Sequence, residues 1–302
     1  MRCLVLLIFG GLLTLGSGSS ARADLAVFAC EPEWAALARE IGGDKATVFA
    51  ATTAQQDPHR VEARPSLIAR FHGADLAICT GAELEIGWLP LLQRQAGNPK
   101  LAEGQPGFFA AANVAELRDM PMSIDRSMGD VHAAGNPHLH LDPRNIARIA
   151  PALAERMAQL DPAQAALYRA RGADFIVRWE TARAAWEAKA APLRGLPVAV
   201  QHRDWVYLAD WLGMTEVVAL EPKPGIPPGA AHLATVLDRL KQTPVKAVLV
   251  AAYQDARPAR WIGERAGVPV VALPFTVGGS PEASSLFGLF DDTLAKLLAA
   301  AR

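Results

Sequence analysis

Short apolar runs alternate with longer amphipathic stretches through the first half of the chain. The runs are typical of buried strands, whereas the stretches have the periodicity of helices. Strands are predicted at 25–29, 46–51 and 75–79, and helices at 33–41, 66–71 and 86–95. The segment 97–135 has Pro, Gly and Asp scattered through it, and we expect it to be irregular.

The same alternation returns in the second half. Strands are predicted at 197–201, 215–220, 247–251 and 268–273, and helices at 205–212, 231–241, 257–266 and 287–301. Strands that alternate with helices favour parallel sheets covered by helices on both faces, so each half predicts an α/β lobe. In such lobes ligands bind outside the carboxyl ends of the strands.

A long helix is predicted between the two halves. Asp161-Pro162 has the pattern of an N-cap followed by Pro in the first turn, and Pro192 ends the helical periodicity at about residue 191. About 29 residues at 1.5 Å each give a helix about 43 Å long, which suits a backbone that bridges two lobes. We therefore expect an N-terminal lobe at 24–160, a linking helix at 161–192 and a C-terminal lobe at 193–302.

Residues 1–23 have the pattern of a secretory signal peptide. Arg2 precedes an apolar stretch from Leu4 to Leu15, and Ala21-Arg22-Ala23 has the A-x-A form of a cleavage site. We expect cleavage after Ala23 and export of the mature chain as a soluble protein, since no later apolar stretch is long enough to span a bilayer. Neither Cys3 nor Cys30 stands where a lipid-anchored cysteine would.

Composition restricts the partners of this chain. Hydrophobic residues make up 51% of the 302 residues, and the formal net charge is −1. The apolar fraction is enough for cores in two lobes and excludes a disordered chain. The near-zero charge gives no electrostatic basis for binding nucleic acid or an anionic membrane surface. A small neutral or cationic ligand is compatible with both values.

Two cysteines remain once the signal peptide is removed. Cys30 and Cys79 each come at the end of a predicted strand, so we expect them at the same edge of one sheet. An exported protein meets an oxidising environment, which allows a disulfide between them. The sequence favours a disulfide and a pair of buried thiols equally.

Three of the seven histidines stand in loops that end a strand or begin a helix. His59 follows a strand in Asp57-Pro58-His59, and His202 directly follows the strand 197–201. His138 lies in the loop that enters a helix predicted to begin at Asp142-Pro143, with Asp as the N-cap and Pro in the first turn. Loops from both lobes can bring these side chains together in one interlobe cleft. Imidazole nitrogens suit tetrahedral Zn²⁺, whereas Mn²⁺ and Mg²⁺ require more oxygen ligands.

Longer motifs follow one another in order over nearly the whole mature chain. They read GGDK at 42–45, DPHRVEARPS at 57–66, TGAELE at 80–85 followed by WL at 88–89, NPHLHLDP at 136–143 and HRDWVYL at 202–208. In these motifs the chain resembles the metal-binding solute receptors of bacterial zinc and manganese ABC importers, the cluster A-I (cluster 9) family.

The resemblance implies two α/β lobes bridged by one long helix, in agreement with the strand and helix pattern. It implies that His59, His138 and His202 are metal ligands. It also implies that the protein is not an enzyme but a periplasmic receptor that captures Zn²⁺ as the transported ion. Its partners are then an inner-membrane ABC permease and the cytoplasmic ATPase of that permease, and we expect the receptor to be a monomer.

One departure from the family pattern concerns the fourth ligand. Family members often have an Asp after the last strand of the second lobe, but residues 273–279 here read LPFTVGG and contain no carboxylate. The Glu that is common near Val250 is missing as well. Water, Asp255 or another carboxylate is left to complete the shell.

A second departure concerns the segment 120–135, which is rich in histidine in many zinc receptors. Here it contains His132 alone, which argues against capture of many zinc ions by this loop. His132 and His140 are candidates for an additional metal ligand or for side chains that orient His138.

Other functions stay open on the sequence alone. A zinc hydrolase needs a general base beside the metal, and no H-E-x-x-H motif occurs in the chain. A periplasmic chaperone or buffer that passes zinc to another protein is compatible with the same fold. So are a manganese receptor and, for a cleft without metal, a receptor for an organic solute.

Overall fold

The computed structural model describes residues 24–121, 129 and 132–302. The expected signal peptide at 1–23 lies outside these residues. Within the described residues, no helix combines the length and the apolar character that crossing a membrane requires.

The first half of the chain forms a sheet of four parallel strands in the order β2-β1-β3-β4. The strands are β1 (Leu25–Ala29), β2 (Ala46–Ala50), β3 (Leu76–Cys79) and β4 (Phe108–Ala110), and the helices of this half are α1 (Pro32–Gly42), α2 (Pro65–His72), α3 (Leu89–Ala96) and α4 (Pro143–Leu160). Strand β4 lies within the segment that we expected to be irregular. Three residues are too few to give an apolar run that a pattern search can detect.

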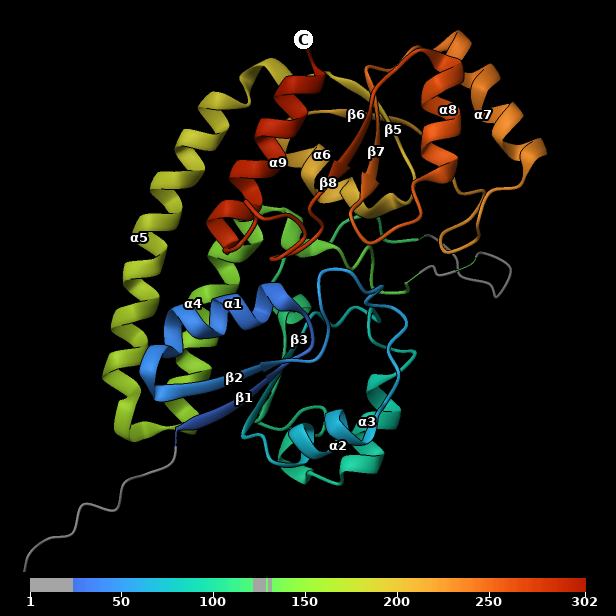
Figure 1. The fold of residues 1–302 in the computed structure, drawn as a ribbon. Helices are drawn as coiled ribbons and strands as arrows, with labels where there is room; N and C mark the ends of the chain where they lie inside the picture. Colours follow the sequence, from blue (N-terminus) through green and yellow to red (C-terminus); the bar gives the residue numbers. More distant parts are fainter. Residues whose placement is uncertain (1–23, 122–128, 130–131) are drawn as a thin grey trace, which may run out of the picture.

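The second half repeats this arrangement, with strand order β6-β5-β7-β8. Its strands are β5 (Pro197–Val200), β6 (Thr215–Ala219), β7 (Ala247–Ala251) and β8 (Val270–Leu273), and its helices are α6 (Val206–Leu212), α7 (Ala230–Gln242), α8 (Arg257–Ala266) and α9 (Leu286–Ala300). The predicted α/β class with two parallel sheets flanked by helices is therefore confirmed. Figure 1 shows the first sheet below and the second above.

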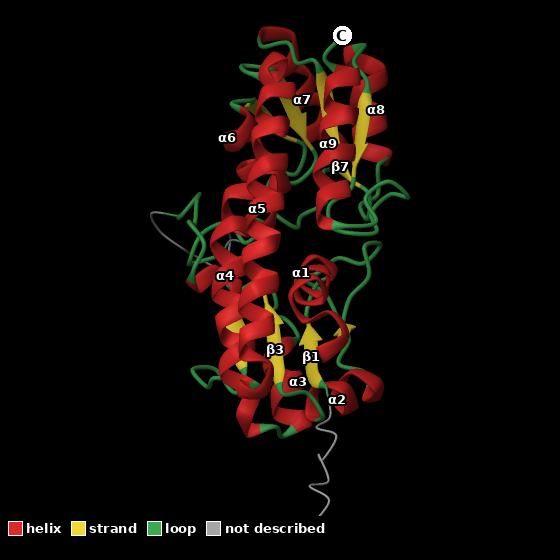
Figure 2. Cartoon of the chain, turned by 90° about the vertical axis from the view of Figure 1, so that its left-hand side faces the viewer, coloured by secondary structure: helices red, strands yellow, loops and turns green. Residues whose placement is uncertain are grey.

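One long helix, α5 (Ala165–Lys189), links the two halves. Its 25 residues correspond to about 38 Å, and it packs on α4 and α1 of the first half and on α9 of the second. Figure 2 shows it passing both sheets along one side of the molecule. The long helix is confirmed, but it begins after a 3-10 turn at Pro162–Gln164, and the Asp161 side chain does not cap it. Instead Asp161 Oδ2 lies 3.1 Å from the hydroxyl of Tyr168.

Aromatic side chains fix α5 to the last helix. Trp179 and Trp186 of α5 lie 5.5 and 5.1 Å, centroid to centroid, from the Phe290 ring of α9, and Phe287 lies 5.0 Å from Trp179. All except Phe287 are buried. Large aromatic contacts of this kind contribute strongly to packing, so the linking helix and the second lobe form one core.

A disulfide joins Cys30 and Cys79. Cys30 follows β1 and Cys79 ends β3, and because these parallel strands are neighbours, the two cysteines lie at the same edge of the sheet. The link ties the two central strands together at their carboxyl ends.

Candidate metal centre

Three histidines converge where the loops of the two sheets meet. One ring nitrogen from each of His59, His138 and His202 lies within 4.8 Å of the others, and the ring centroids are 5.5 to 6.0 Å apart. His59 lies between β2 and α2, His138 before the 3-10 turn that leads into α4, and His202 just after β5. The cluster thus draws on the carboxyl ends of strands in both sheets, where the strand pattern placed it.

Carboxylates orient two of these rings from behind. Asp57 Oδ1 lies 2.9 Å from His59 Nδ1, and Glu221 Oε2 lies 2.7 Å from His202 Nδ1. A carboxylate at Nδ1 holds the proton on that nitrogen and leaves Nε2 as the electron-pair donor. His59 Nε2 is buried and has no hydrogen-bond partner among the described residues. The two rings are therefore set to offer Nε2 to a ligand.

His138 occupies the most enclosed position of the three. Its side chain is 1% exposed, and neither ring nitrogen has a hydrogen-bond partner among the described residues. Burial, together with the charges of neighbouring histidines, holds the pKa of His138 well below its usual value. Because a neutral imidazole is the form that binds a metal, this environment suits a ligand.

His202 is in a different electrostatic environment. Burial alone would lower its pKa, but the charge of Asp204 and the hydrogen bond to Glu221 outweigh it and raise the pKa to about 9. A cation is therefore stabilised at this position at neutral pH. A metal ion that binds His202 replaces the proton and meets the same carboxylates.

His140 has contacts of another kind. It is fully buried, its Nε2 lies 2.8 Å from the carbonyl oxygen of Phe275, and its Nδ1 lies 3.3 Å from Glu33 Oε1. Nε2 thus has a hydrogen-bond partner, Nδ1 has none among the described residues, and His140 is not one of the three histidines whose nitrogens converge. It connects α1 with the loop after β8.

His132 lies beside the cluster. Its ring stacks on that of His59 with centroids 5.4 Å apart, and it lines a cavity of about 60 Å³ together with His138 and His202. The backbone N–H of the next residue, Ala133, donates to Glu83 Oε2 at 2.6 Å. This hydrogen bond holds the loop over His59.

Asp255 is not brought to the three histidines. Its side chain is half exposed and forms an ion pair with Arg257. The loop after β8 contributes the Phe275 ring, which lies 5.4 Å from the ring of His138. The carboxylates that do surround the histidines were missed from the sequence: Asp57, Asp204 and Glu221.

A polar network holds the His138 loop to the second lobe. Tyr207 of α6 donates its hydroxyl proton to Asn136 O at 2.6 Å and accepts a hydrogen bond from Arg118 N at 3.0 Å. The amide of Asn136 donates to Arg203 O at 2.8 Å, and its Oδ1 accepts from His138 N at 3.0 Å. Asn136 thus binds the backbone of His138 and the backbone of Arg203, the residue that follows His202.

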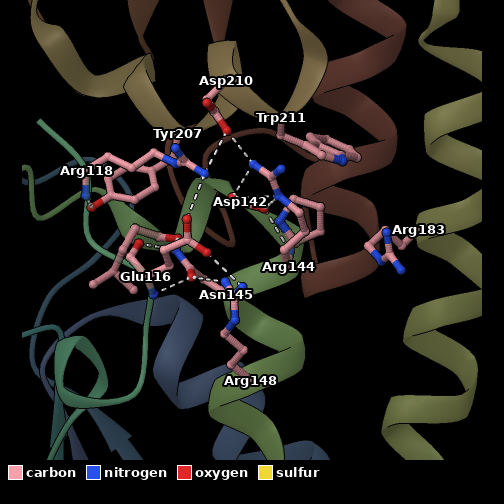
Figure 3. A network of polar contacts seen from close by, with 12 residues as sticks. Glu116, Arg118, Asp142, Arg144, Asn145, Arg148, Arg183, Tyr207, Asp210 and Trp211 are labelled. Atoms are coloured by element: carbon pink, nitrogen blue, oxygen red, sulfur yellow. Dashed lines mark hydrogen bonds and ion pairs between the residues drawn. The ribbon is translucent and has the colours of Figure 1, made fainter.

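Charged side chains extend this network towards solvent. Asp210 of α6 lies between Arg118 and Arg144, at 3.0 and 2.6 Å (Figure 3). Arg144 is also bound by Asp142, the residue that caps α4. Partly exposed pairs of this kind contribute little each, but together they fix α6 against the start of α4.

A family model described as ZnuA, zinc-uptake complex component A periplasmic, matches residues 27–300. One relative is the manganese ABC transporter substrate-binding lipoprotein PsaA of Streptococcus pneumoniae, 24% identical over 279 residues, covering 90% of this chain and 87% of the relative. Another is the metal ABC transporter substrate-binding lipoprotein FimA of Streptococcus parasanguinis, 23% identical over 275 residues, with 90% and 87% covered.

Solved structures share the fold. A crystal structure of ZnuA has a TM-score of 0.75 at 22% identity, covering 91% of this chain and 99% of that one. The solute-binding protein FpvC from Pseudomonas aeruginosa, in complex with Mn²⁺, has a TM-score of 0.71 at 22% identity, covering 92% and 97%.

Proposed function

Because the chain belongs to the family of ZnuA-type periplasmic metal receptors, which serve ABC importers and are not enzymes, we propose that it captures Zn²⁺ at His59, His138 and His202. Receptors of this kind work with a membrane permease and its ATPase. The convergence of three imidazole nitrogens within 4.8 Å, from loops of both sheets, carries the proposal. The captured ion is cargo, to be passed on to the permease.

The choice of zinc rests on the donor atoms. Three imidazoles, two of them oriented by carboxylates at Nδ1, suit the coordination that zinc prefers. Manganese is the second candidate. It prefers oxygen donors, and the carboxylates around the histidines provide them at close range. The PsaA relative is named for manganese, and the FpvC structure is a manganese complex.

Location and assembly complete the proposal. Removal of residues 1–23 releases a periplasmic receptor with lobes at 24–160 and 193–302 joined by the segment 161–192. It acts as a monomer that docks on the permease. A zinc chaperone or buffer would use the same site but would pass the ion to a different protein.

Metal titration tests the site. The mature chain is stripped of metal and titrated with Zn²⁺ and with Mn²⁺ against a coloured chelator. We expect one tightly bound zinc per chain, weaker manganese binding, and loss of zinc binding in His59→Ala, His138→Ala and His202→Ala. His72→Ala is the matched control, because His72 lies at the end of α2 and contacts Ala96 O.

Two results would overturn the assignment: no bound metal, or zinc binding that survives all three substitutions. Delivery is tested separately, with the permease and its ATPase in lipid vesicles. Zinc uptake that requires the loaded receptor supports the importer role. A receptor that binds zinc but supports no uptake indicates a chaperone or buffer.

A further inference from the structure

Asp204 lies beside His138, the most enclosed of the three histidines. It is the middle residue of the 3-10 turn Arg203–Trp205 that follows His202, and its side chain is completely buried. Its Oδ1 is 3.7 Å from His138 Nε2. That separation is too long for a hydrogen bond, so this close approach of a carboxylate and an imidazole needs another explanation.

The hydrogen bonds of Asp204 come from neutral groups, and its charge interacts with that of the His202 ring. Gln254 Nε2 donates to its Oδ2 at 2.8 Å, and the Tyr253 hydroxyl donates to its Oδ1 at 3.3 Å. In the described part of the chain, no Lys or Arg forms an ion pair with Asp204. Buried carboxylates are normally paired with a cation or bound to a metal, because an isolated buried charge is strongly unfavourable.

The His138 ring, which faces Asp204, is buried, and neither of its nitrogens has a hydrogen-bond partner among the described residues. Two ligands of a tetrahedral zinc ion, each bound at about 2.0–2.2 Å, lie about 3.2–3.6 Å apart. The 3.7 Å between Asp204 Oδ1 and His138 Nε2 is therefore close to the separation of two atoms that share one metal ion.

We propose that Asp204 Oδ1 is the fourth ligand of the ion held by His59, His138 and His202. This inference rests on the proposed function and adds the residue that completes its coordination. The Phe275 ring, which also packs on His138 with the ring centroids 5.4 Å apart, offers no donor atom. Asp204 approaches from the second lobe, next to His202, and its charge partly neutralises the divalent ion.

Gln254 and Tyr253 are then positioning residues. Their hydrogen bonds hold the carboxylate in place while one lone pair of Oδ1 remains available to the metal. A carboxylate oxygen also broadens the range of ions, because oxygen donors suit manganese better than imidazole does. Loss of this ligand should therefore weaken manganese binding by a larger factor than zinc binding.

A crystal structure of the zinc-loaded protein tests the ligand directly. We expect Asp204 Oδ1 at about 2.0–2.2 Å from the zinc ion. An Asp204 oxygen more than 3 Å from zinc, with water or another side chain in the fourth position, would overturn the proposal. Absence of bound zinc would overturn this proposal and the proposed function together, whereas three histidine ligands without Asp204 would overturn this one alone.

Solution measurements use Asp204→Asn beside Asp255→Asn. The control removes the same charge from an exposed carboxylate paired with Arg257. We expect Asp204→Asn to weaken zinc binding at least tenfold and manganese binding further, and Asp255→Asn to change neither. Equal metal affinities in Asp204→Asn and the unsubstituted protein would contradict the assignment.

Thermal unfolding separates a ligand from a side chain that only supports the fold. In the metal-stripped protein, Asp204→Asn should unfold close to the temperature of the unsubstituted chain, because removal of a buried carboxylate offsets the loss of its attraction to the His202 ring. The rise in unfolding temperature on adding Zn²⁺ should shrink. A lower unfolding temperature without metal, together with an unchanged rise on adding zinc, would assign Asp204 to the fold alone.

Discussion

The Tyr207 hydroxyl lies at the point where α6 of the second lobe meets the loop that carries His138. It donates to Asn136 O and accepts from Arg118 N, and the Tyr207 side chain is completely buried. Asn136 in turn binds His138 N and the carbonyl of Arg203, next to His202. We predict that Tyr207→Phe loosens the spacing of these two histidines while leaving every metal ligand in the chain.

The expected size follows from the hydrogen bonds that are lost. Each contributes about 1 kcal/mol net, and leaving a buried polar group without a partner costs about 1–3 kcal/mol. The substitution removes two hydrogen bonds and affects two backbone groups, so we expect the free energy of unfolding to fall by about 2–3 kcal/mol. If about half of that free energy is also lost from zinc binding, the zinc dissociation constant rises about tenfold.

Tyr168→Phe is the matched control. The Tyr168 hydroxyl is also buried and donates to Lys45 O at 2.9 Å, with Asp161 Oδ2 at 3.1 Å. Lys45 directly precedes β2, at the edge of the first sheet opposite to the histidines. This variant should lose a similar free energy of unfolding and keep its zinc affinity.

Urea denaturation of the metal-stripped chains gives the free energy of unfolding, and competition with a zinc chelator gives the zinc dissociation constant. The reasoning is refuted if Tyr207→Phe loses stability but binds zinc as tightly as the unsubstituted protein. It is equally refuted if the two Phe variants lose zinc affinity to the same extent, because the effect would then be one of general stability.

Three further predictions concern pH, the disulfide and the carboxylates behind the histidines. Burial raises the pKa of Glu85 to about 7, so its protonated form stabilises the fold below about pH 4.5 and this contribution is lost as the pH rises through 7. Relative to Glu85→Gln, the metal-stripped protein should therefore be less stable at pH 8 than at pH 5, as measured by urea denaturation. The prediction is contradicted if the unsubstituted protein and Glu85→Gln differ in free energy of unfolding by the same amount at pH 5 and at pH 8. Reduction of Cys30–Cys79, or its replacement by Ser, should lower the free energy of unfolding by about 2–4 kcal/mol, and an unchanged urea midpoint would argue against a stabilising bond. Asp57→Asn and Glu221→Gln should each weaken zinc binding about 10- to 100-fold in the chelator assay, and unaltered affinity would show that these carboxylates do not orient the rings.

Much of the fold could be predicted because its signals are local. Apolar runs and helix ends are set by neighbouring residues, so the strands and helices of both sheets fall close to their expected positions. Strand β4 was missed because three residues form no periodic pattern. The start of α5 was placed too early, since Asp161 binds Tyr168, a partner that its neighbours in the chain do not reveal.

In the candidate site too, some residues could be predicted from the sequence and others could not. The three converging histidines were found from motifs and from their places at strand ends. Glu221 was missed although the same argument could have found it: it follows β6 as His202 follows β5, and these neighbouring parallel strands end at one edge of the sheet. The role of Asp204 depends on its depth and on its distance from His138, which sequence neighbours do not determine.

The contacts between the lobes bear on how the ion is captured. His140 donates to the carbonyl of Phe275, Thr276 donates to Glu33, and Tyr207 donates to Asn136, so several buried hydrogen bonds cross between the halves. The ring nitrogens lie within 4.8 Å of one another and need to approach by at most about 1.5 Å to reach the spacing of a tetrahedral zinc site. Rotation of side chains and small shifts of loops supply a movement of that size. Wide opening would break several buried hydrogen bonds at about 1 kcal/mol or more each. Small-angle scattering should therefore give the same radius of gyration with and without zinc, and a clear decrease on loading would show that the lobes close.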